Sequence, residues 1–301
     1  MTGNGFGRIF RLTTFGESHG AGIGGVLEGC PPGLELDEAL IQAELNARRP
    51  GQAGEISSTP RKEADLVKIL SGVFEGKSTG QPVAFFIENT SQNSGDYNRL
   101  KDIYRPGHAD YSWQQKFGVR DHRGGGRASA RETAARVAGG AIALAFLKTQ
   151  GIAVNAFCVE FGGLKAELVD LAGANGRPCF SPDPEAVARW QARVEEAREA
   201  GETLGGIVRI EAHGIPAGLG DPVFDGLDAR LGAAFLSVGA VKGVEFGAGF
   251  AAARLTGGEN NDILTAGGFL TNQAGGVQGG VSNGNSLVCG VAVKPIPSLG
   301  K

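Results

Sequence analysis

The stretch VLEGCPPGLELDEALIQAEL, residues 26–45, predicts a strand, a tight turn and a helix in direct succession. Its turn has the pattern G-x-P-x-G-L, and Asp37 stands where a helix N-cap is wanted. The same order recurs in IEAHGIPAGLGDPVFDGLDARL, residues 210–231, with Asp225 at the capping position. Chance agreement of common turn residues gives such a pattern too, but two copies favour a duplicated α+β unit.

Hydrophobic patterning predicts further elements around these two units. The strands expected are 23–28, 82–88, 152–161, 205–213, 243–246 and 287–293, and the helices are 37–49, 63–71, 111–117, 128–149, 184–200 and 225–238. No linker or block of charge divides the chain. We therefore expect an α+β fold with an internal duplication, in a single compact domain over residues 1–301.

The composition excludes several classes of protein. A net charge of −3 argues against a nucleic-acid partner, and the most apolar run, residues 138–147, is too short to cross a membrane. The four cysteines, Cys30, Cys158, Cys179 and Cys289, have no zinc-site spacing, and no pair of histidines has ligand spacing. With no signal peptide at the start, the sequence predicts a reduced, cytoplasmic protein without a metal site.

Glycine is the unusual component, at 51 of 301 residues, where about 7% is typical. Three glycines, Gly124–Gly126, lie in a basic segment, residues 99–136, that holds nine basic and four acidic residues. The segment continues RASARET, in which Ser129 and Glu132 form a capping-box pattern before an alanine-rich helix. Glycines before a capped helix favour an anion site, although a capped helix with surface arginines has the same pattern.

The stretch GESHG, residues 16–20, fits two interpretations. It matches the G-x-S-x-G elbow of serine hydrolases, with Ser18 as nucleophile and His108 or His213 as base. It also suits a bend where the backbone and an imidazole approach a small substrate. Only 15 residues precede Gly16, too few for the strands that an elbow requires, so the bend is favoured.

Five motifs in order closely resemble the chorismate synthase family. They are TTFGESHG (13–20), RPGHADY (105–111), RGGGRASARET (123–133), NQAGGVQGG (272–280) and Lys294-Pro295. The resemblance covers the chain from about residue 5 to its end. It implies a β-α-β sandwich fold and a homotetramer. It also implies a lyase that converts 5-enolpyruvylshikimate 3-phosphate to chorismate by 1,4-anti-elimination of phosphate and a C6 hydrogen, with reduced FMN.

The resemblance assigns roles to residues of this chain. His19 is the general acid near the leaving phosphate, and His108 lies near the flavin. Substrate anions are held by Ser18, Arg48, Arg105 and Arg131. FMN contacts fall on Arg127, Ala128, Ser129, Gly239, Ala240, Gly279, Lys294, Pro295, Ile296, Pro297 and Ser298. His122 and His213 are expected to have no role in the reaction.

The chain departs from the family pattern in three places. The segment Gln52–Ile56 lacks the usual arginine, which Arg61 is a candidate to replace. Ile296 stands where the family carries a hydroxyl, and the chain ends at Lys301, before a family segment with an Arg-His-Asp-Pro motif. A chain without that segment is expected to turn over poorly, which keeps an impaired flavin- or anion-binding protein as an alternative. No nicotinamide fingerprint is present, so an external flavin reductase is favoured over intrinsic use of NADP.

Overall fold

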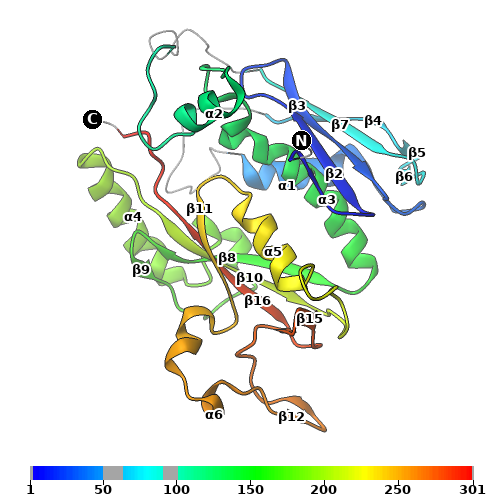
Figure 1. Cartoon of the computed structure of the whole chain (residues 1–301), viewed down its shortest axis with the longest axis vertical. Helices are drawn as coiled ribbons and strands as arrows, with labels where there is room; N and C mark the ends of the chain where they lie inside the picture. The colour runs from blue at the N-terminus through cyan, green and yellow to red at the C-terminus, as the bar shows by residue number, and fades with distance from the viewer. Residues whose placement is uncertain (1–2, 50–63, 91–100, 300–301) are drawn as a thin grey trace. The chain divides into compact units, whose positions relative to one another are not determined.

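The computed structural model describes residues 3–49, 64–90 and 101–299, and it divides into two compact units, Met1–Thr149 and Gln150–Lys301. Within the described residues, each unit contains a five-stranded antiparallel sheet (Figure 1). Gln52–Ile56 and Arg61, singled out above, lie outside the described residues.

The first unit is built on the strand order β1-β2-β3-β7-β4. Its strands are β1 (Gly5–Phe6), β2 (Arg11–Gly16), β3 (Gly22–Glu28), β4 (Val67–Ser71), β5 (Val73–Phe74), β6 (Lys77–Ser78) and β7 (Val83–Glu88), and its helices are α1 (Glu38–Arg48), α2 (Asp110–Phe117) and α3 (Thr133–Thr149). Helices α1 and α3 pack against each other, and α3 covers β2, β3 and β7. Gly139 of α3 lies so close to Leu12 of β2 that a Cβ there would meet the leucine methyl at 2.6 Å.

The core of this unit lies between the sheet and the two helices. Phe85 of β7, Leu45 of α1 and Ile142 of α3 are each completely buried in it. Burying one such side chain contributes about 1.5–3 kcal/mol. This packing fixes the central strand β3, and with it the short connection from β2 to β3.

The second unit repeats the arrangement with the order β11-β16-β10-β8-β9. Its strands are β8 (Ala153–Phe161), β9 (Leu164–Lys165), β10 (Gly206–His213), β11 (Val241–Phe246), β12 (Leu264–Thr265), β13 (Gly268–Phe269), β14 (Val277–Gln278), β15 (Val281–Ser282) and β16 (Leu287–Val293), and its helices are α4 (Pro184–Glu199), α5 (Leu227–Leu236) and α6 (Gly257–Asn260). Trp190 of α4 is fully buried and donates its indole N–H to the carbonyl of Leu164, at 2.8 Å.

The four longer strands of the two sheets have equivalent topology, whereas the short edge strand precedes its neighbour in the first sheet (β1) and follows it in the second (β9). In each, the central strand (β3 or β10) leads through the predicted turn to a helix (α1 or α5). The next long strand (β4 or β11) lies at an edge of its sheet, and the last long one (β7 or β16) returns beside the central strand. The predicted α+β class is confirmed, and the strand–turn–helix repeat occupies matching places in the two sheets.

Several local predictions need correction. The predicted helix 63–71 is strand β4 over Val67–Ser71, because pairing with β7 and burial of Val67 decide its conformation. Asp37 does cap α1, accepting from the Leu40 N–H at 2.8 Å. Asp225 does not cap α5, since the N-cap is Gly226 and the Asp225 carboxylate instead lies 3.5 Å from Arg230.

The predicted capping box of Ser129 and Glu132 is also wrong in part. Ser129 caps a 3₁₀ turn, Ala130–Glu132 (η3), and the α-helix begins only at Thr133. Glu132 does not reach back to Ser129; its carboxylate accepts from the Thr14 hydroxyl at 3.0 Å and from Arg136 at 2.8 Å. Glu132 therefore ties the start of α3 to strand β2.

Candidate functional site

The connection between β2 and β3 carries the GESHG motif into the interior of the first unit. It consists of residues 17–21, and Ser18 and His19 are 5% and 3% exposed. The Ser18 hydroxyl is buried and has no hydrogen-bond partner among the residues that the structure describes. A buried hydroxyl of this kind favours a ligand as its partner, because an unpaired buried polar group costs free energy.

The glycine loop lies against this connection. Gly124, Gly125 and Gly126 all have positive φ, which side-chain-bearing residues rarely adopt. A Cβ on Gly124 would lie 2.7 Å from His19 Nε2 and 3.1 Å from Ser18 Oγ. The Ser18 N–H also donates to the Gly126 carbonyl at 3.4 Å. The sequence-predicted bend and the sequence-predicted glycine loop therefore form one site.

Arg105 and His108 enter from the turn before α2. A Cβ on Gly125 would lie 3.3 Å from Arg105 Nη2, which places the guanidinium beside the glycine loop. Arg105 donates from Nε and Nη2 to the two oxygens of Asp110, both at 2.9 Å. These bonds lower the pKa of Asp110, so the carboxylate stays ionised and fixes the guanidinium. His108 is half-buried, and its Nδ1 lies 3.0 Å from the Pro106 carbonyl oxygen.

Arg48 and Arg131 meet on one buried carboxylate. Asp65 is 2% exposed; its Oδ2 accepts from Arg48 Nη1 at 3.0 Å, and its Oδ1 accepts from Arg131 Nη1. Arg131 is itself buried and donates from Nε to Asn89 Oδ1 at 3.0 Å. Two cations around one anion leave a net positive charge. This charge lies close to the β2–β3 connection, which Asn89 also contacts.

The three residues assigned to FMN in this unit lie at the start of α3. Arg127, in the 3₁₀ turn Gly126–Ala128 (η2), donates to the Gly16 carbonyl at 3.2 Å and to the Thr14 hydroxyl at 2.7 Å. Its guanidinium thus connects the glycine loop to β2. Ala128 is exposed, and Ser129 Oγ accepts from the Arg131 N–H at 3.4 Å.

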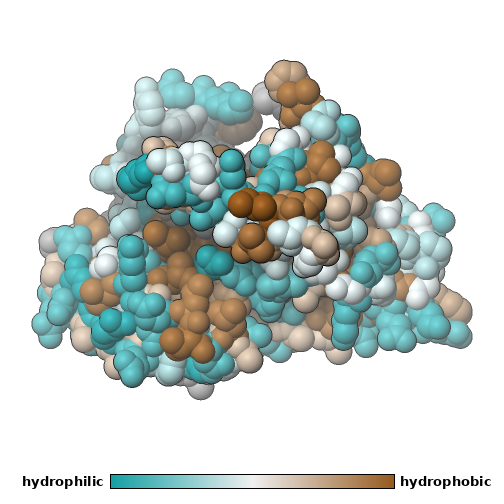
Figure 2. All heavy atoms as spheres, turned by 90° about the horizontal axis from the view of Figure 1, so that it is seen from below, coloured by the Kyte–Doolittle hydropathy of each residue, from teal (hydrophilic) through white to brown (hydrophobic). Residues whose placement is uncertain are grey.

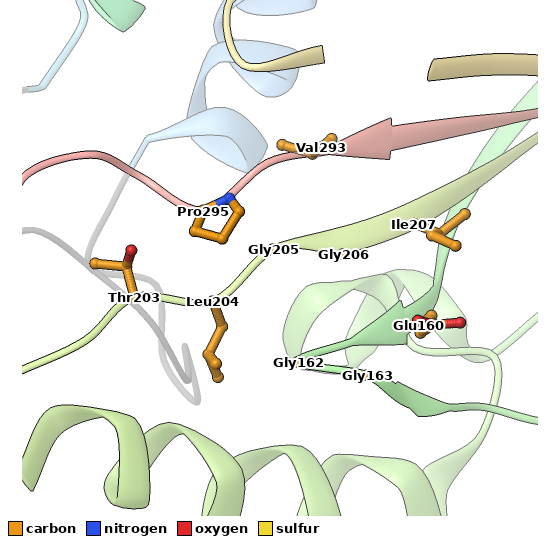
Figure 3. Close-up of a pocket in the computed structure, with 10 residues that line it drawn as sticks. All are labelled: Glu160, Gly162, Gly163, Thr203, Leu204, Gly205, Gly206, Ile207, Val293 and Pro295. Carbon is orange, nitrogen blue, oxygen red and sulfur yellow. The ribbon is translucent and has the colours of Figure 1, made fainter. Parts of the chain in front are cut away.

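In the second unit, two of the segments assigned to FMN lie side by side. The Lys294 N–H donates to the Ala240 carbonyl at 2.9 Å, and Ala240 has a φ of 72°. Beside them the ends of β8, β10 and β16 surround a cavity of about 290 Å³ (Figure 3). Its walls are formed by Glu160, Gly162, Gly163, Thr203, Leu204, Gly205, Gly206, Ile207, Val293 and Pro295.

Other assigned residues of the second unit are more exposed. Ile296 is 61% exposed, and its carbonyl accepts from the Thr203 hydroxyl at 2.6 Å. Pro297 is half-buried and Ser298 exposed, as is Gly239. Gly279 lies in the β14–β15 hairpin, beside the start of β16, whereas Lys294 follows its end. The two positions therefore lie toward opposite ends of β16.

The geometry does not support the serine hydrolase interpretation. Ser18 lies between two antiparallel neighbouring strands, and not on the strand-to-helix turn that exposes a nucleophile. His213, in the second unit, pairs its Nδ1 with Ser286 Oγ at 2.8 Å and lies 46% exposed beside Glu211. What the first unit offers instead is a buried imidazole beside carboxylate-fixed arginines, which suits an enzyme that binds and protonates a small anion.

Three residues of the site were not singled out from the sequence. Asp65 and Asn89 come from segments with no motif, and Asp110 is only one of the four acidic residues counted in the basic segment. A signal existed for Asp110, because it lies inside RPGHADY. Asp65 and Asn89 join the site only through the pairing of β4 with β7 and of β7 with β3.

Known proteins give the same picture over nearly the whole chain. The family model described as chorismate synthase matches residues 10–301. The chain is 62% identical to chorismate synthase of Nitratidesulfovibrio vulgaris (strain Hildenborough) over 299 residues, which cover 99% of this chain and 84% of that protein. It is 54% identical to chorismate synthase of Syntrophobacter fumaroxidans, covering 100% and 85%. A crystal structure of chorismate synthase superposes with a TM-score of 0.81 at 36% identity, over 96% of this chain and 85% of that one.

The chain belongs to the chorismate synthase family. The family consists of lyases, so the predicted enzyme class and fold class are confirmed, and neither the hydrolase nor the impaired binding protein finds support. No helix in the described part of the chain is long and apolar enough to cross a membrane. Within the same residues, no three histidine, cysteine, aspartate or glutamate side chains gather as metal ligands.

Proposed function

We propose that this chain converts 5-enolpyruvylshikimate 3-phosphate to chorismate and phosphate. In this 1,4-anti-elimination the bond from the ring carbon to the phosphate oxygen breaks, and its electron pair leaves with the phosphate. The electron pair of the C6–H bond forms the new ring double bond, and the proton lost from C6 balances the proton that the phosphate takes from His19. The observation that carries the proposal is the buried pair Ser18 and His19 against Gly124, with an unpartnered hydroxyl beside an imidazole. His19 protonates the departing phosphate, and the Ser18 hydroxyl donates to an oxygen of the substrate.

Arginines supply the positive charge that two carboxylates and a phosphate require. Arg48, Arg105 and Arg131 are each held by a carboxylate, so their guanidinium groups are oriented before substrate arrives. A preorganised donor costs no reorganisation when charge develops on the leaving group. Arg105, on the loop with His108, lies beside the glycine loop and is the arginine best placed to bind the phosphate.

The proposed cofactor is reduced FMN, and the residues proposed to contact it are Arg127, Ala128, Ser129, Gly239, Ala240, Gly279 and Lys294 to Ser298. When bound, reduced FMN supplies electron density that assists loss of the allylic phosphate. The residues present fit such a group, because the hydrogen-bonded backbones of Ala240 and Lys294 lie beside a cavity. Four glycines in the wall of this cavity leave the backbone accessible to a ligand. With FMN bound, His108 would lie beside it. An external reductase supplies the reduced flavin.

We further propose that residues 1–301 form one chorismate synthase domain, which assembles as a homotetramer in the cytoplasm. Apolar side chains on the surface support assembly: Phe224 and Phe250 are 94% and 77% exposed. Figure 2 shows separate apolar patches among hydrophilic surface on one face of the molecule. Such patches mark interaction surfaces. All four cysteines are free thiols, as a reducing compartment requires.

The test is an anaerobic assay with chemically reduced FMN and 5-enolpyruvylshikimate 3-phosphate, read as release of inorganic phosphate. His19→Ala and His108→Ala are each expected to lower kcat about 10²–10⁴-fold, which is what a positioned acid contributes. His122→Ala, in the same basic segment as His108, is the matched control and should keep its activity. Wild-type protein that releases no phosphate, or a His19→Ala variant as active as His122→Ala, contradicts the proposal.

A further inference from the structure

Asn89 closes the connection that carries His19. It follows β7, is 8% exposed, and uses both polar groups of its side chain in hydrogen bonds. Its side-chain Nδ2 donates to the carbonyls of Glu17 and Gly20, at 2.9 and 3.0 Å, and its backbone N–H donates to the carbonyl of Ala21 at 3.1 Å. The two side-chain bonds fall on either side of Ser18 and His19.

The partners of Asn89 determine which way its amide points. Arg131 Nε carries only a donor, so it requires the Asn89 oxygen, which it meets at 3.0 Å. The carbonyls of Glu17 and Gly20 are acceptors only and require the amide nitrogen. Arg131 is in turn held by the buried carboxylate of Asp65. Hydrogen bonds therefore fix each side chain between Asp65 and the β2–β3 connection.

We propose that Asn89 is a positioning residue for His19, with Arg131 and Asp65 as its support. This inference rests on the proposed function, in which His19 protonates the leaving phosphate. Asn89 donates to backbone carbonyls on either side of His19, so it acts by fixing the backbone from which the imidazole projects. Arg131 accordingly has a second task besides its charge, which is to hold the Asn89 amide in the orientation that the loop needs.

The diagnostic variant is Asn89→Asp. It keeps the oxygen that Arg131 needs and replaces the two N–H donors by an oxygen facing two carbonyl oxygens. We expect kcat for phosphate release, at saturating substrate and reduced FMN, to fall about 10- to 100-fold, as a displacement approaching 1 Å does. KM should stay within threefold. Ser78→Ala is the matched control, because Ser78 is 4% exposed and hydrogen-bonded in the same unit but outside the site; its kcat should stay within twofold of wild type.

A double-mutant cycle separates positioning from general damage. In a His19→Ala background, Asn89→Asp should lower kcat no further than twofold, because the group that it positions is already gone. An equal fall in both backgrounds overturns the proposal, and so does an unchanged kcat in Asn89→Asp alone. If His19→Ala itself keeps full activity, the proposed function fails instead. Should Asn89→Asp not fold, Asn89→Ser removes the same donors without adding charge, and the same outcomes apply.

Discussion

Replacing Gly124 by alanine places a methyl group in the candidate site at a known position. The added Cβ would lie 2.6 Å from His19 Cδ2 and 2.7 Å from Nε2, where ordinary contacts begin at 3.4 Å. The imidazole, or the glycine loop, must therefore shift by about 0.8 Å. Since a misplacement of about 1 Å can cost 10²-fold in rate, we expect kcat to fall about 10²-fold.

The same substitution also strains the backbone, and this part needs its own control. Gly124 has a φ of 65°, and a side chain there costs about 1–2 kcal/mol. Gly118, the C-cap of α2, has a φ of 72°, and its Cβ would meet nothing within 4 Å. Gly118→Ala therefore carries the strain without the collision. Both variants should lose about 2–8 °C in Tm.

The assay measures kcat for phosphate release under anaerobic conditions at saturating reduced FMN, together with the thermal midpoint of each variant. We expect only Gly124→Ala to lose kcat, while the two midpoints fall by similar amounts. If Gly124→Ala keeps kcat within threefold of Gly118→Ala, the contact between the glycine loop and His19 has no part in the reaction, and the argument built on it is refuted.

Two further predictions concern titratable groups. Hydrogen bonds from Arg105 lower the pKa of Asp110, so the pair stabilises the fold above about pH 4, the unfolded pKa, and this contribution is lost as pH falls through the lower folded value. Asp110→Asn should therefore be less stable than wild type at pH 7, and the difference in free energy of unfolding should close in denaturant titrations at pH 2–3. A difference that is independent of pH would contradict the pairing. Burial raises the pKa of Cys158 to about 12 and that of Cys289 to about 11, so iodoacetamide at pH 8 should label the half-exposed Cys179 first; peptide mass spectrometry that finds Cys158 labelled as quickly in native protein would rule this out.

The spacing of apolar residues was enough to predict most of the long helices and strands, because the apolar residues of each lie on the face that it buries. Strand β16 was predicted to the residue, and β3 and β10 to within one residue at each end. Residues 63–71 were predicted as a helix because a short apolar segment fits the pattern of a helix and that of a strand equally well. Only β7, which pairs with Val67 to Ser71, decides between them, and no local pattern contains that information.

The site residues that belong to sequence motifs could be predicted. The site residues that are brought in by strand pairing could not. GESHG and RGGGRASARET each carry glycines that signal close approach, and the structure brings them into contact through Gly124. Asp65 and Asn89 are ordinary polar residues by their local sequence. They acquire a role because β4 and β7 deliver them to Arg131 across 66 and 42 residues of chain.

The length of the connection between β2 and β3 limits how this enzyme can diverge. It has five residues, whereas the equivalent connection from β8 to β10 runs over residues 162–205 and contains all of α4. An inserted or deleted residue in the short hairpin would either expel His19 or slip β2 by one position, and such a slip turns every side chain of the strand to the opposite face. We therefore expect an insertion to be tolerated in the long connection and not in the short hairpin.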